Sequence, residues 1–408
     1  MTESEAKRVE TDRLGALELP ADALAGIHSE RAQRHLCFSG RRLGDYPELV
    51  RALARVKQAA ARANRAAGRL GARERDAIEA ACQTLAVGHD ADALAVDPLA
   101  GGGGIAVNMN VNEVIAGLAR RAGVALDPKR HVNASQSTAD VCHTAQRLAV
   151  LERWGPLAPA LSELVGALRA QAEAGRALPT IARTCLRDGL ATTVGTLFEG
   201  HAAALARRSE ALRRSIDALR AVNLGGTVIG SGEGAPPAYR ERVLAELATL
   251  CGLALSPRAS LYDAAQNADD LGAVSAELAA LARELIKLAG DLRLLASGPA
   301  TGFGEIDLPP VIEGSSFFAG KSNPVVPETL LHCAFQVLGC DRAAQAALEH
   351  AELHLNVFEA VVAVNVLDAL AMLARAVPHA SACVRGLHAD AERCREHAER
   401  ALGTGESV

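Results

Sequence analysis

The segment Gly314–Asn323, which reads Gly-Ser-Ser-Phe-Phe-Ala-Gly-Lys-Ser-Asn, gathers side chains suited to acid–base and anion chemistry. Serine hydroxyls, a lysine ammonium and an asparagine amide can all donate hydrogen bonds to a carboxylate or to a developing negative charge. Gly314 and Gly320 are suitable hinges for a loop that closes over a ligand. Ordinary connecting loops are also rich in Ser, Gly and Asn. The composition of this segment therefore leaves both interpretations open.

Lysine is scarce in the chain, and this makes the lysine of that segment conspicuous. The 408 residues contain 43 Lys and Arg against 48 Asp and Glu, and nearly all of the positive charge is arginine. The net charge is only −5, and neither sign is gathered into a block. Proteins that grip nucleic acid or anionic lipid need such a block, so we expect neither partner. A small molecule is the expected ligand.

The cysteines and the N-terminal residues indicate the compartment. The nine cysteines are scattered without a CxxC pair, which argues against a zinc ribbon, a redox motif or a disulfide scaffold. The first 15 residues lack the apolar core of a signal peptide, and no later stretch reaches about 18 apolar residues free of charge. We expect a cytoplasmic protein that does not span a membrane and needs neither a metal nor a cofactor.

The glycine run Gly101–Gly104 is the other unusual loop. Four glycines in a row could cradle a phosphate, but the Lys-Ser/Thr of a P-loop and a preceding strand are both missing. Nucleotide binding is therefore not favoured.

Most of the chain is predicted to be helical, because Ala, Leu, Arg and Glu dominate and apolar residues recur at spacings of three and four. The clearest helices are expected over residues 49–70, 158–174, 192–219, 237–251, 270–297 and 343–376. Long, alanine-rich helices pack closely in bundles. Since aromatic residues make up only 3% of the chain, much of the apolar surface is expected to be buried between subunits, which favours an oligomer.

Five segments resemble the aspartase/fumarase superfamily in the same order and at suitable spacing. They are Asn108–Glu113, His131–Thr138, Thr184–Gly200, Asn223–Thr227 with Ala235–Pro237, and Gly314–Glu328. The pattern Gly-Ser-Ser-x-x-x-x-Lys-x-Asn-Pro in the last segment is highly specific. Ala265–Asp269 and Leu355–Glu359 are more similar to aspartase than to fumarase.

The resemblance implies a mainly α long-helix bundle that forms a homotetramer, with a central bundle shared between subunits and active sites composed of segments from several subunits. It implies an N-terminal helical domain over residues 1–135 and a central bundle over 136–388. The remaining residues, 389–408, would form a C-terminal small domain shorter than in the family.

The resemblance also implies a chemistry and its residues. Enzymes of this family remove a proton beside a carboxylate and expel a group from the neighbouring carbon, giving fumarate or a similar product. Ser315 would be the general base, Lys321 would pair with a substrate carboxylate, and Asn323 would add a hydrogen bond. Further substrate-binding donors would be Asn108, Ser137, Thr138, Thr184 and Ser316.

Three positions depart from the family where relatives carry polar contacts. Ile105 stands in place of a hydroxyl residue, Ala139 in place of an asparagine that helps to place the leaving group, and Cys185 in place of a histidine. An ammonium group would lose partners there, at a cost of roughly 1–3 kcal/mol for each group left unpaired. We expect neither efficient ordinary aspartase nor fumarase activity.

Two hypotheses remain from the sequence. In the first, the chain is a lyase whose leaving-group pocket has been rebuilt for a modified nitrogen group on succinate; in the second, it is a pseudoenzyme or a partner subunit. The retention of Ser315, Lys321 and Asn323 together favours the first hypothesis.

Three residues near the departures have open roles. Cys185 could be a nucleophile, although a small buried thiol is the more common situation. His143 could replace the missing histidine, although a surface or satisfied core histidine is more common. Arg187 could add positive charge, or it could be solvated or ion-paired.

Overall fold

The computed structural model describes residues 6–402, and its internal contacts divide the chain into two compact units. Unit 1 comprises Met1–Glu152, Ile216–Ala273 and Ala343–Leu367, and unit 2 comprises Arg153–Ser215, Val274–Arg342 and Asp368–Val408. The boundaries fall inside long helices, so that several helices contribute residues to both units.

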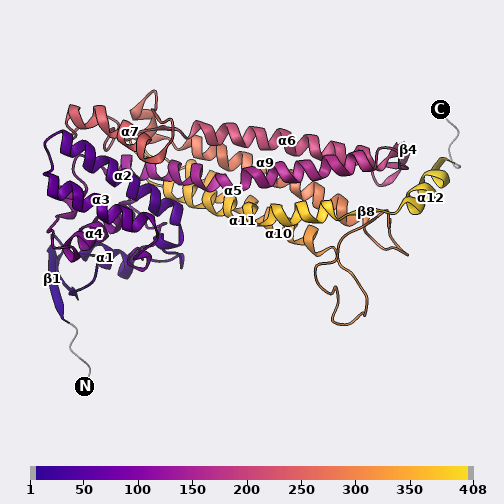
Figure 1. The fold of residues 1–408 in the computed structure, drawn as a ribbon, viewed down its shortest axis with the longest axis horizontal. Coiled ribbons are helices and arrows are strands. Elements are labelled where there is room, and N and C mark those ends of the chain that lie inside the picture. The colour runs from indigo at the N-terminus through magenta and orange to yellow at the C-terminus, as the bar shows by residue number, and fades with distance from the viewer. Residues whose placement is uncertain (1–5, 403–408) are drawn as a thin grey trace, which may run out of the picture. The chain divides into compact units, whose positions relative to one another are not determined.

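Unit 1 is built around an alanine-rich helix, α2 (Pro47–Ala66), which packs against α3 (Ala72–Ala86) and α7 (Pro237–Cys251) (Figure 1). Ala59, Ala60 and Ala63 of α2 are completely buried, and small side chains let the helix axes approach closely. Proline opens both α2 and α7, where its missing N–H costs no helical hydrogen bond. The other α-helices and strands of unit 1 outside the long helices are β1 (Lys7–Asp12), β2 (Gly15–Pro20), α1 (Ile27–Leu36), α4 (Ile105–Arg121), β5 (Ala221–Val222), β6 (Ser256–Pro257) and α8 (Leu261–Gln266).

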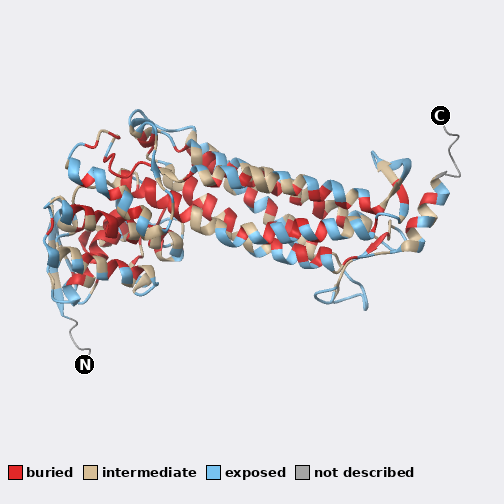
Figure 2. Cartoon of the chain, turned by 45° about the horizontal axis from the view of Figure 1, so that its top comes forward, coloured by how far each residue is buried: buried red, intermediate tan, exposed pale blue. Residues whose placement is uncertain are grey.

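Long helices make up most of unit 2, where they lie side by side as a bundle (Figures 1 and 2). They are α5 (Thr138–Ala174), α6 (Val194–Ala218), α9 (Asp269–Leu295), α10 (Val325–Leu348) and α11 (Glu359–Arg385). Each helix carries a buried stripe toward its neighbours and an exposed face on the other side (Figure 2). The prediction of a mainly helical, long-helix fold is confirmed.

Two predicted helices are wrong in their extent. The helix predicted over residues 158–174 is the C-terminal part of the longer α5 (Thr138–Ala174), and the helix predicted over 343–376 is interrupted. The pattern over residues 343–376 predicted a single helix, but α10 ends at Leu348 and α11 begins at Glu359. Between them Leu353 has a left-handed φ of 47°, and the Asn356 N–H donates to the carbonyl of Ala265 at 2.9 Å. This tertiary hydrogen bond holds an irregular segment that helical periodicity alone cannot reveal.

Within residues 6–402, short strands form four two-stranded sheets that the sequence did not predict. In unit 1, β1 pairs with β2 in an antiparallel hairpin, and β5 pairs with β6 in parallel. In unit 2, β3 (Pro179–Thr184) and β4 (Arg187–Thr193) form a second hairpin, and β7 (Ile306–Asp307) pairs with β8 (His388–Ala389) just before α12 (Ala391–Leu402). The β3–β4 hairpin packs against α12.

Among the described residues, α11 alone is long and apolar enough to meet the length and composition criteria for a membrane span. Buried core helices meet the same criteria, and 56% of the most apolar stretch of α11 is buried inside the chain. Asp368 and Arg375 also interrupt this stretch.

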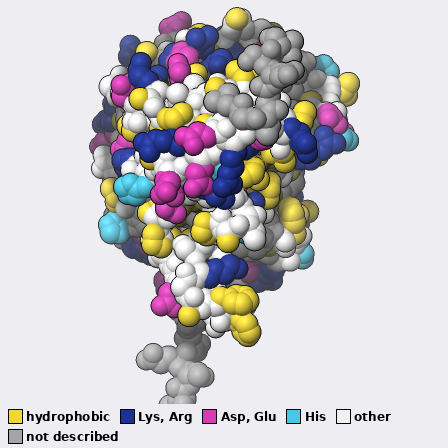
Figure 3. Space-filling view, turned by 90° about the vertical axis from the view of Figure 1, so that its right-hand side faces the viewer, with side chains coloured by type: hydrophobic (Ala, Val, Ile, Leu, Met, Phe, Trp, Pro, Cys, Tyr) yellow, Lys and Arg dark blue, Asp and Glu magenta, His cyan; other side chains and the backbone are white. Residues whose placement is uncertain are grey.

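Acidic and basic side chains are interspersed on the face drawn in Figure 3. This face therefore carries no extended field of one sign that would attract a polyanion.

Candidate active site

The first turn of α5 is tied to a glycine-rich turn by a buried carboxylate. Asp140 is fully buried; its Oδ1 accepts from the Ser137 N–H at 2.9 Å, and its Oδ2 accepts from the N–H groups of Gly225 and Thr227 at 3.0 and 3.1 Å. Burial raises the pKa of Asp140 to about 6, although the three N–H donors oppose this rise. The carboxylate thus fixes Ser137 and the residues that follow it.

A buried polar network, which we call the Lys57 network, holds Thr138 in place. The Asn108 amide donates to Asn133 Oδ1 at 3.1 Å and to Thr138 Oγ1 at 2.9 Å. Lys57 Nζ donates to Asn133 Oδ1 at 2.8 Å and to Gln136 Oε1 at 3.0 Å. The lysine side chain has no exposed surface, and its burial lowers the pKa of the ammonium to about 7.

The glycine run packs against the same turn and leads into α4. Gly102, Gly103 and Gly104 all have left-handed φ values between 64° and 91°. A Cβ on Gly104 would come within 2.8 Å of the Cys142 sulfur, so only glycine allows this close approach. Ile105, the first residue of α4, is 43% exposed, and Ala139 is half-buried. Asn108, Ser137, Thr138, Ala139 and Ile105 are therefore gathered in one region of unit 1.

Thr184 and Cys185 lie at the tip of the β3–β4 hairpin. Cys185 and Leu186 form a two-residue turn with left-handed φ values of 52° and 58°. Thr184, Cys185 and Arg187 are all exposed within this chain. The expectation of a buried Cys185 thiol was therefore wrong, because the turn directs both central residues away from the bundle core. The exposure of Arg187 agrees with a solvated arginine.

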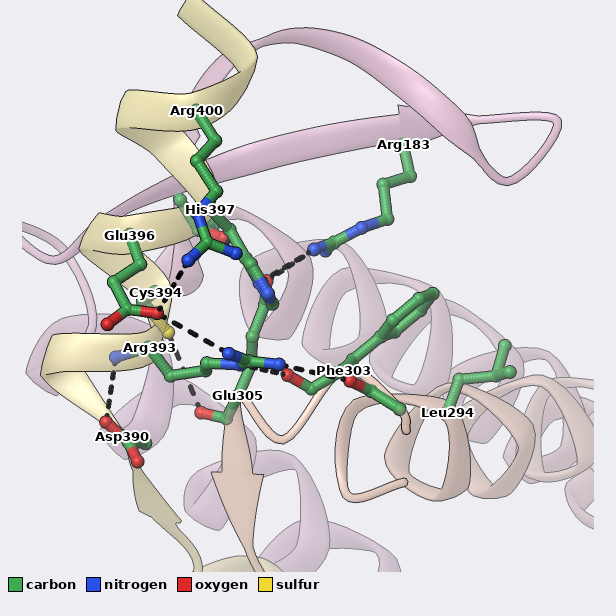
Figure 4. A network of polar contacts seen from close by, with 12 residues as sticks. Arg183, Leu294, Phe303, Glu305, Asp390, Arg393, Cys394, Glu396, His397 and Arg400 are labelled. Carbon is green, nitrogen blue, oxygen red and sulfur yellow. Dashed lines mark hydrogen bonds and ion pairs between the residues drawn. The ribbon is translucent and has the colours of Figure 1, made fainter. Parts of the chain in front are cut away.

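The hairpin is anchored by one buried carboxylate, Glu305 (Figure 4). Glu305 Oε1 accepts from Arg183 Nη2 at 2.6 Å and lies 2.6 Å from His397 Nδ1 on α12. Thr180 Oγ1 lies 3.2 Å from the same oxygen, and the Arg183 guanidinium stacks 4.4 Å from the ring centroid of Phe303. These contacts hold β3 at the residue just before Thr184. Burial opposes a charged Glu305, but the hydrogen bonds with Arg183 and His397 outweigh it and lower the pKa of the carboxyl.

The loop that carries Ser315 and Lys321 is largely exposed. Ser315 Oγ accepts from the N–H groups of Phe317 at 3.1 Å and Phe318 at 2.9 Å. Such donors stabilise negative charge on a serine oxygen. The side-chain amide of Asn323 donates to the carbonyl of Gly314, which closes the base of the loop. The Lys321 ammonium is 5.8 Å from the ring centroid of Phe318, and Ser316 is exposed.

His143 lies one turn beyond Ala139 on α5, and it is buried rather than on the surface. It is only 2% exposed, and neither ring nitrogen has a hydrogen-bond partner among the described residues. Burial, with Arg147 and Arg258 adding repulsion, holds the pKa of His143 well below its ordinary value, so the ring is neutral. The expectation of a surface or satisfied histidine was wrong.

Sequence reasoning missed two buried charged groups in unit 1. Lys57 was not singled out, although a single lysine within an alanine-rich helix indicates a special environment. Arg147 was not singled out. Its fully buried guanidinium donates to both oxygens of Asp270 at 2.7 Å and to Glu359.

The comparisons with known proteins agree with this architecture. A family model described as a lyase matches residues 15–339. An aspartate ammonia-lyase from Pseudomonas aeruginosa is 41% identical over 405 residues, which cover 97% of this chain and 85% of that protein. An aspartate ammonia-lyase from Bacillus subtilis is 36% identical over 404 residues, covering 97% of this chain and 86% of that protein.

Two solved structures have the same fold. A structure of a fumarate lyase:delta crystallin from Brucella melitensis bound to cobalt has a TM-score of 0.94 at 39% identity, and covers 98% of this chain and 88% of that chain. A class II fumarase from Schistosoma mansoni has a TM-score of 0.93 at 26% identity, with 97% of this chain and 88% of that chain covered.

The family model, the relatives and the long-helix fold thus define a lyase. The chain belongs to the aspartase/fumarase superfamily.

Proposed function

We propose that this protein is a carbon–nitrogen lyase that eliminates a nitrogen-containing group from a substituted succinate to give fumarate, or catalyses the reverse addition. The relatives named aspartate ammonia-lyase support carbon–nitrogen chemistry on a small dicarboxylate. The observation that carries the proposal is which residues of the family pattern are retained. The groups suited to binding carboxylates are retained, whereas Ile105, Ala139 and Cys185 replace the polar groups suited to binding an ammonium.

In this proposal Ser315 removes the proton from the carbon beside one carboxylate. A serine hydroxyl is a poor base in water, so its oxygen must be stabilised as an alkoxide before it can accept the proton. The N–H groups of Phe317 and Phe318 already donate to Ser315 Oγ. Closure of the loop over the substrate would exclude water and strengthen these contacts.

The reaction then places a second negative charge on that carboxylate, and this charge must be met by prepositioned donors. Lys321 supplies a positive charge and Asn323 a directional hydrogen bond. Ser137, Thr138, Thr184 and Ser316 supply further hydroxyls, and Asn108 supplies an amide that also fixes Thr138. Each such donor contributes roughly 3 kcal/mol to stabilising the transition state.

These groups come from the Lys57 network, the β3–β4 hairpin and the Gly314–Asn323 loop, and we propose that a homotetramer brings them together in composite sites. Within one chain the hairpin tip is exposed, with Leu186 and Leu190 68% and 70% exposed. A neighbouring subunit would cover this apolar surface.

The leaving group in this proposal is a less basic or bulkier nitrogen group than ammonia. A good leaving group needs less protonation as it departs, and so it tolerates the loss of the polar residues replaced by Ile105, Ala139 and Cys185. No metal or cofactor enters the proposed reaction.

The test is incubation of the purified protein with fumarate and a panel of nitrogen nucleophiles while the fumarate absorbance is followed. We expect faster consumption with substituted amines, hydrazine or nitrite than with ammonia. Deamination of aspartate at roughly 1–10³ per second would contradict the rebuilt pocket. The absence of any turnover or dicarboxylate binding would favour a pseudoenzyme or partner subunit.

A matched variant sharpens this test. The double change Ala139→Asn and Cys185→His restores the family pattern, and it should raise aspartate deamination from a low background. No increase, with the fold intact by circular dichroism, would contradict the role given to these two positions.

A further inference from the structure

A small polar cavity of ≈ 20 Å³ lies beside Ala139 in unit 1. Ala139 and His143 are four residues apart on α5 and therefore share one face of the helix. They line the cavity with Gln146 of the same helix, Asn223 of the glycine-rich turn and Asn356 of the irregular segment between α10 and α11. The space is sufficient for one water molecule or for a chemical group of similar size.

Four of the residues that line the cavity carry buried polar atoms without partners. Both ring nitrogens of His143, both side-chain amide atoms of Asn223, Nδ2 of Asn356 and Oε1 of Gln146 have no hydrogen-bond partner among the described residues. These four side chains are 2%, 0%, 5% and 6% exposed in the same order. Each buried polar group left unpaired costs roughly 1–3 kcal/mol. An occupant that forms hydrogen bonds with these groups would remove this cost.

The arrangement of these groups is fixed by the fold. The Asn356 N–H donates to the Ala265 carbonyl, and Asn356 Oδ1 accepts from the Phe358 N–H at 3.0 Å, which leaves Nδ2 available. The carbonyl of Asn223 accepts from the Gly226 N–H at 2.9 Å. The carbonyl of His143 accepts from Arg147 Nη1 at 3.0 Å.

Glu359 also lines the cavity, but the charged groups around it are already paired with one another, so they do not favour an ammonium group as the occupant. His143 is neutral, because burial and the two neighbouring arginines hold its pKa low. The nearby carboxylate of Glu359 is already paired with the buried Arg147, which Asp270 also neutralises. What remains is a set of neutral donors and acceptors, which favours an uncharged group that both donates and accepts hydrogen bonds.

We propose that this cavity is the subsite for the outer atoms of the nitrogen substituent on succinate, and that His143, Asn223 and Asn356 select a hydrogen-bonding N–O or N–N group of one or two non-hydrogen atoms. This inference rests on the proposed lyase function. It adds the chemical class of the leaving group and three specificity-determining residues. Ala139 opens the way to the cavity by omitting the amide that relatives carry at its position.

The experiment is a set of calorimetric binding measurements in a Ser315→Ala background, so that the ligands are not consumed. N-hydroxyaspartate and hydrazinosuccinate carry the expected polar atom beyond the nitrogen. N-methylaspartate carries a carbon of similar size in the same place and serves as the matched ligand. We expect the first two to bind at least about tenfold more tightly than the third.

The matched variants separate hydrogen bonding from shape. His143→Leu should reduce this preference to about threefold or less, whereas His143→Gln, which keeps hydrogen-bonding atoms, should retain part of it. His89→Leu, at an exposed histidine, should leave the preference unchanged. Circular dichroism checks that each variant is folded, and His143→Gln tests the subsite if His143→Leu does not fold.

The outcomes distinguish the two proposals. Equal affinities for all three ligands, or a preference that His143→Leu and His143→Gln leave intact, would overturn the subsite and reduce the cavity to a water site. If the His143-dependent preference is observed but the wild-type protein eliminates the nitrogen group from none of the substituted succinates, the subsite would be supported and the lyase proposal contradicted. Binding of none of the three ligands would overturn both.

Discussion

Two regions of this protein supply hydroxyl groups for the proposed reaction, and they are built in opposite ways. Thr138 is part of the buried Lys57 network, in which its oxygen accepts from Asn108 and the network is supported by a fully buried lysine. Ser315 lies in a largely exposed loop, where its oxygen is held by two N–H groups of the loop itself.

The two regions therefore have different tasks: the Lys57 network contributes to the stability of the fold, and the loop contributes to the proposed chemistry. Buried polar groups contribute to stability only when they are paired, so a change in the Lys57 network or its surroundings alters the whole fold. An exposed loop contributes few contacts to the core, so a change there alters only what the loop does. In the proposed reaction, the network would therefore hold the substrate-binding groups rigidly, and the loop would be free to close.

The change Ser315→Ala should show the largest effect, and it should fall on activity alone. We expect the turnover rate to fall by ~10²–10⁴-fold, because a proposed general base is lost. The melting temperature should change by less than about 2 °C, because the hydroxyl contacts only its own loop. Steady-state kinetics and thermal melting measure the two effects. A loss of activity smaller than about a hundredfold would remove Ser315 as the base.

At the buried Arg147 we expect the opposite result, a loss of stability. The change Arg147→Met leaves the carboxylates of Asp270 and Glu359 without their buried partner, which should lower the free energy of unfolding by about 3–5 kcal/mol. Chemical denaturation measures this loss. Arg13→Met, at an exposed arginine, should have almost no effect. Equal effects of the two changes would show that the buried ion pairs do not support unit 1.

The buried Lys57 predicts how the free energy of unfolding changes with pH. Its pKa is about 7 in the folded chain against an ordinary value of 10.5. Between these values the unfolded chain binds more protons, so this group makes the free energy of unfolding rise with pH, by up to about 1.4 kcal/mol per pH unit. The raised pKa of Asp140, about 6 against 3.8, acts below this window.

Denaturation curves at several pH values test this prediction with a matched pair of variants. Lys57→Met should flatten the rise in stability between pH 7 and 10, whereas Lys129→Met, at an exposed lysine, should leave it unchanged. A wild-type curve that is already flat over this range would mean that the buried lysine keeps its proton.

The smallest effect is expected at Lys321. Lys321→Ala should weaken succinate binding by about tenfold and also slow turnover, because one charge-assisted contact to a carboxylate is lost. Calorimetry measures the affinity, with Lys129→Ala as the control. If both the affinity and the rate are unchanged, Lys321 is excluded from the site. This result would also weaken the assignment of the proposed chemistry to the loop and of stability to the Lys57 network.

Local patterns in the sequence predicted the helices well and the irregular segments poorly. The helix predicted over 237–251 is observed with the same bounds, because apolar spacing and Pro237 define it. The turn at Cys185 and Leu186 was missed, since neither residue is a glycine or an asparagine, the usual residues at left-handed positions. The break between α10 and α11 depends on a hydrogen bond to Ala265, which lies far away in the sequence.

For the candidate site, the residue types could be predicted from the sequence, but the environments of these residues could not. The Gly-Ser-Ser motif identified the loop, and the Asn108–Thr138 contact joins two of the predicted substrate-binding residues. The burial of Lys57 and the unpaired nitrogens of His143 arise from packing among segments distant in the chain. No spacing rule within one segment contains that information.

The Glu305 carboxylate joins three parts of the chain through Thr180, Arg183 and His397. Such an arrangement constrains how the protein can evolve. Losing Glu305 alone would leave the guanidinium of Arg183 without its carboxylate partner. Losing His397 alone would remove one of the contacts that hold α12 against the hairpin. We therefore expect Arg183, Glu305 and His397 to covary in descendants of this sequence, so that they are exchanged together or not at all.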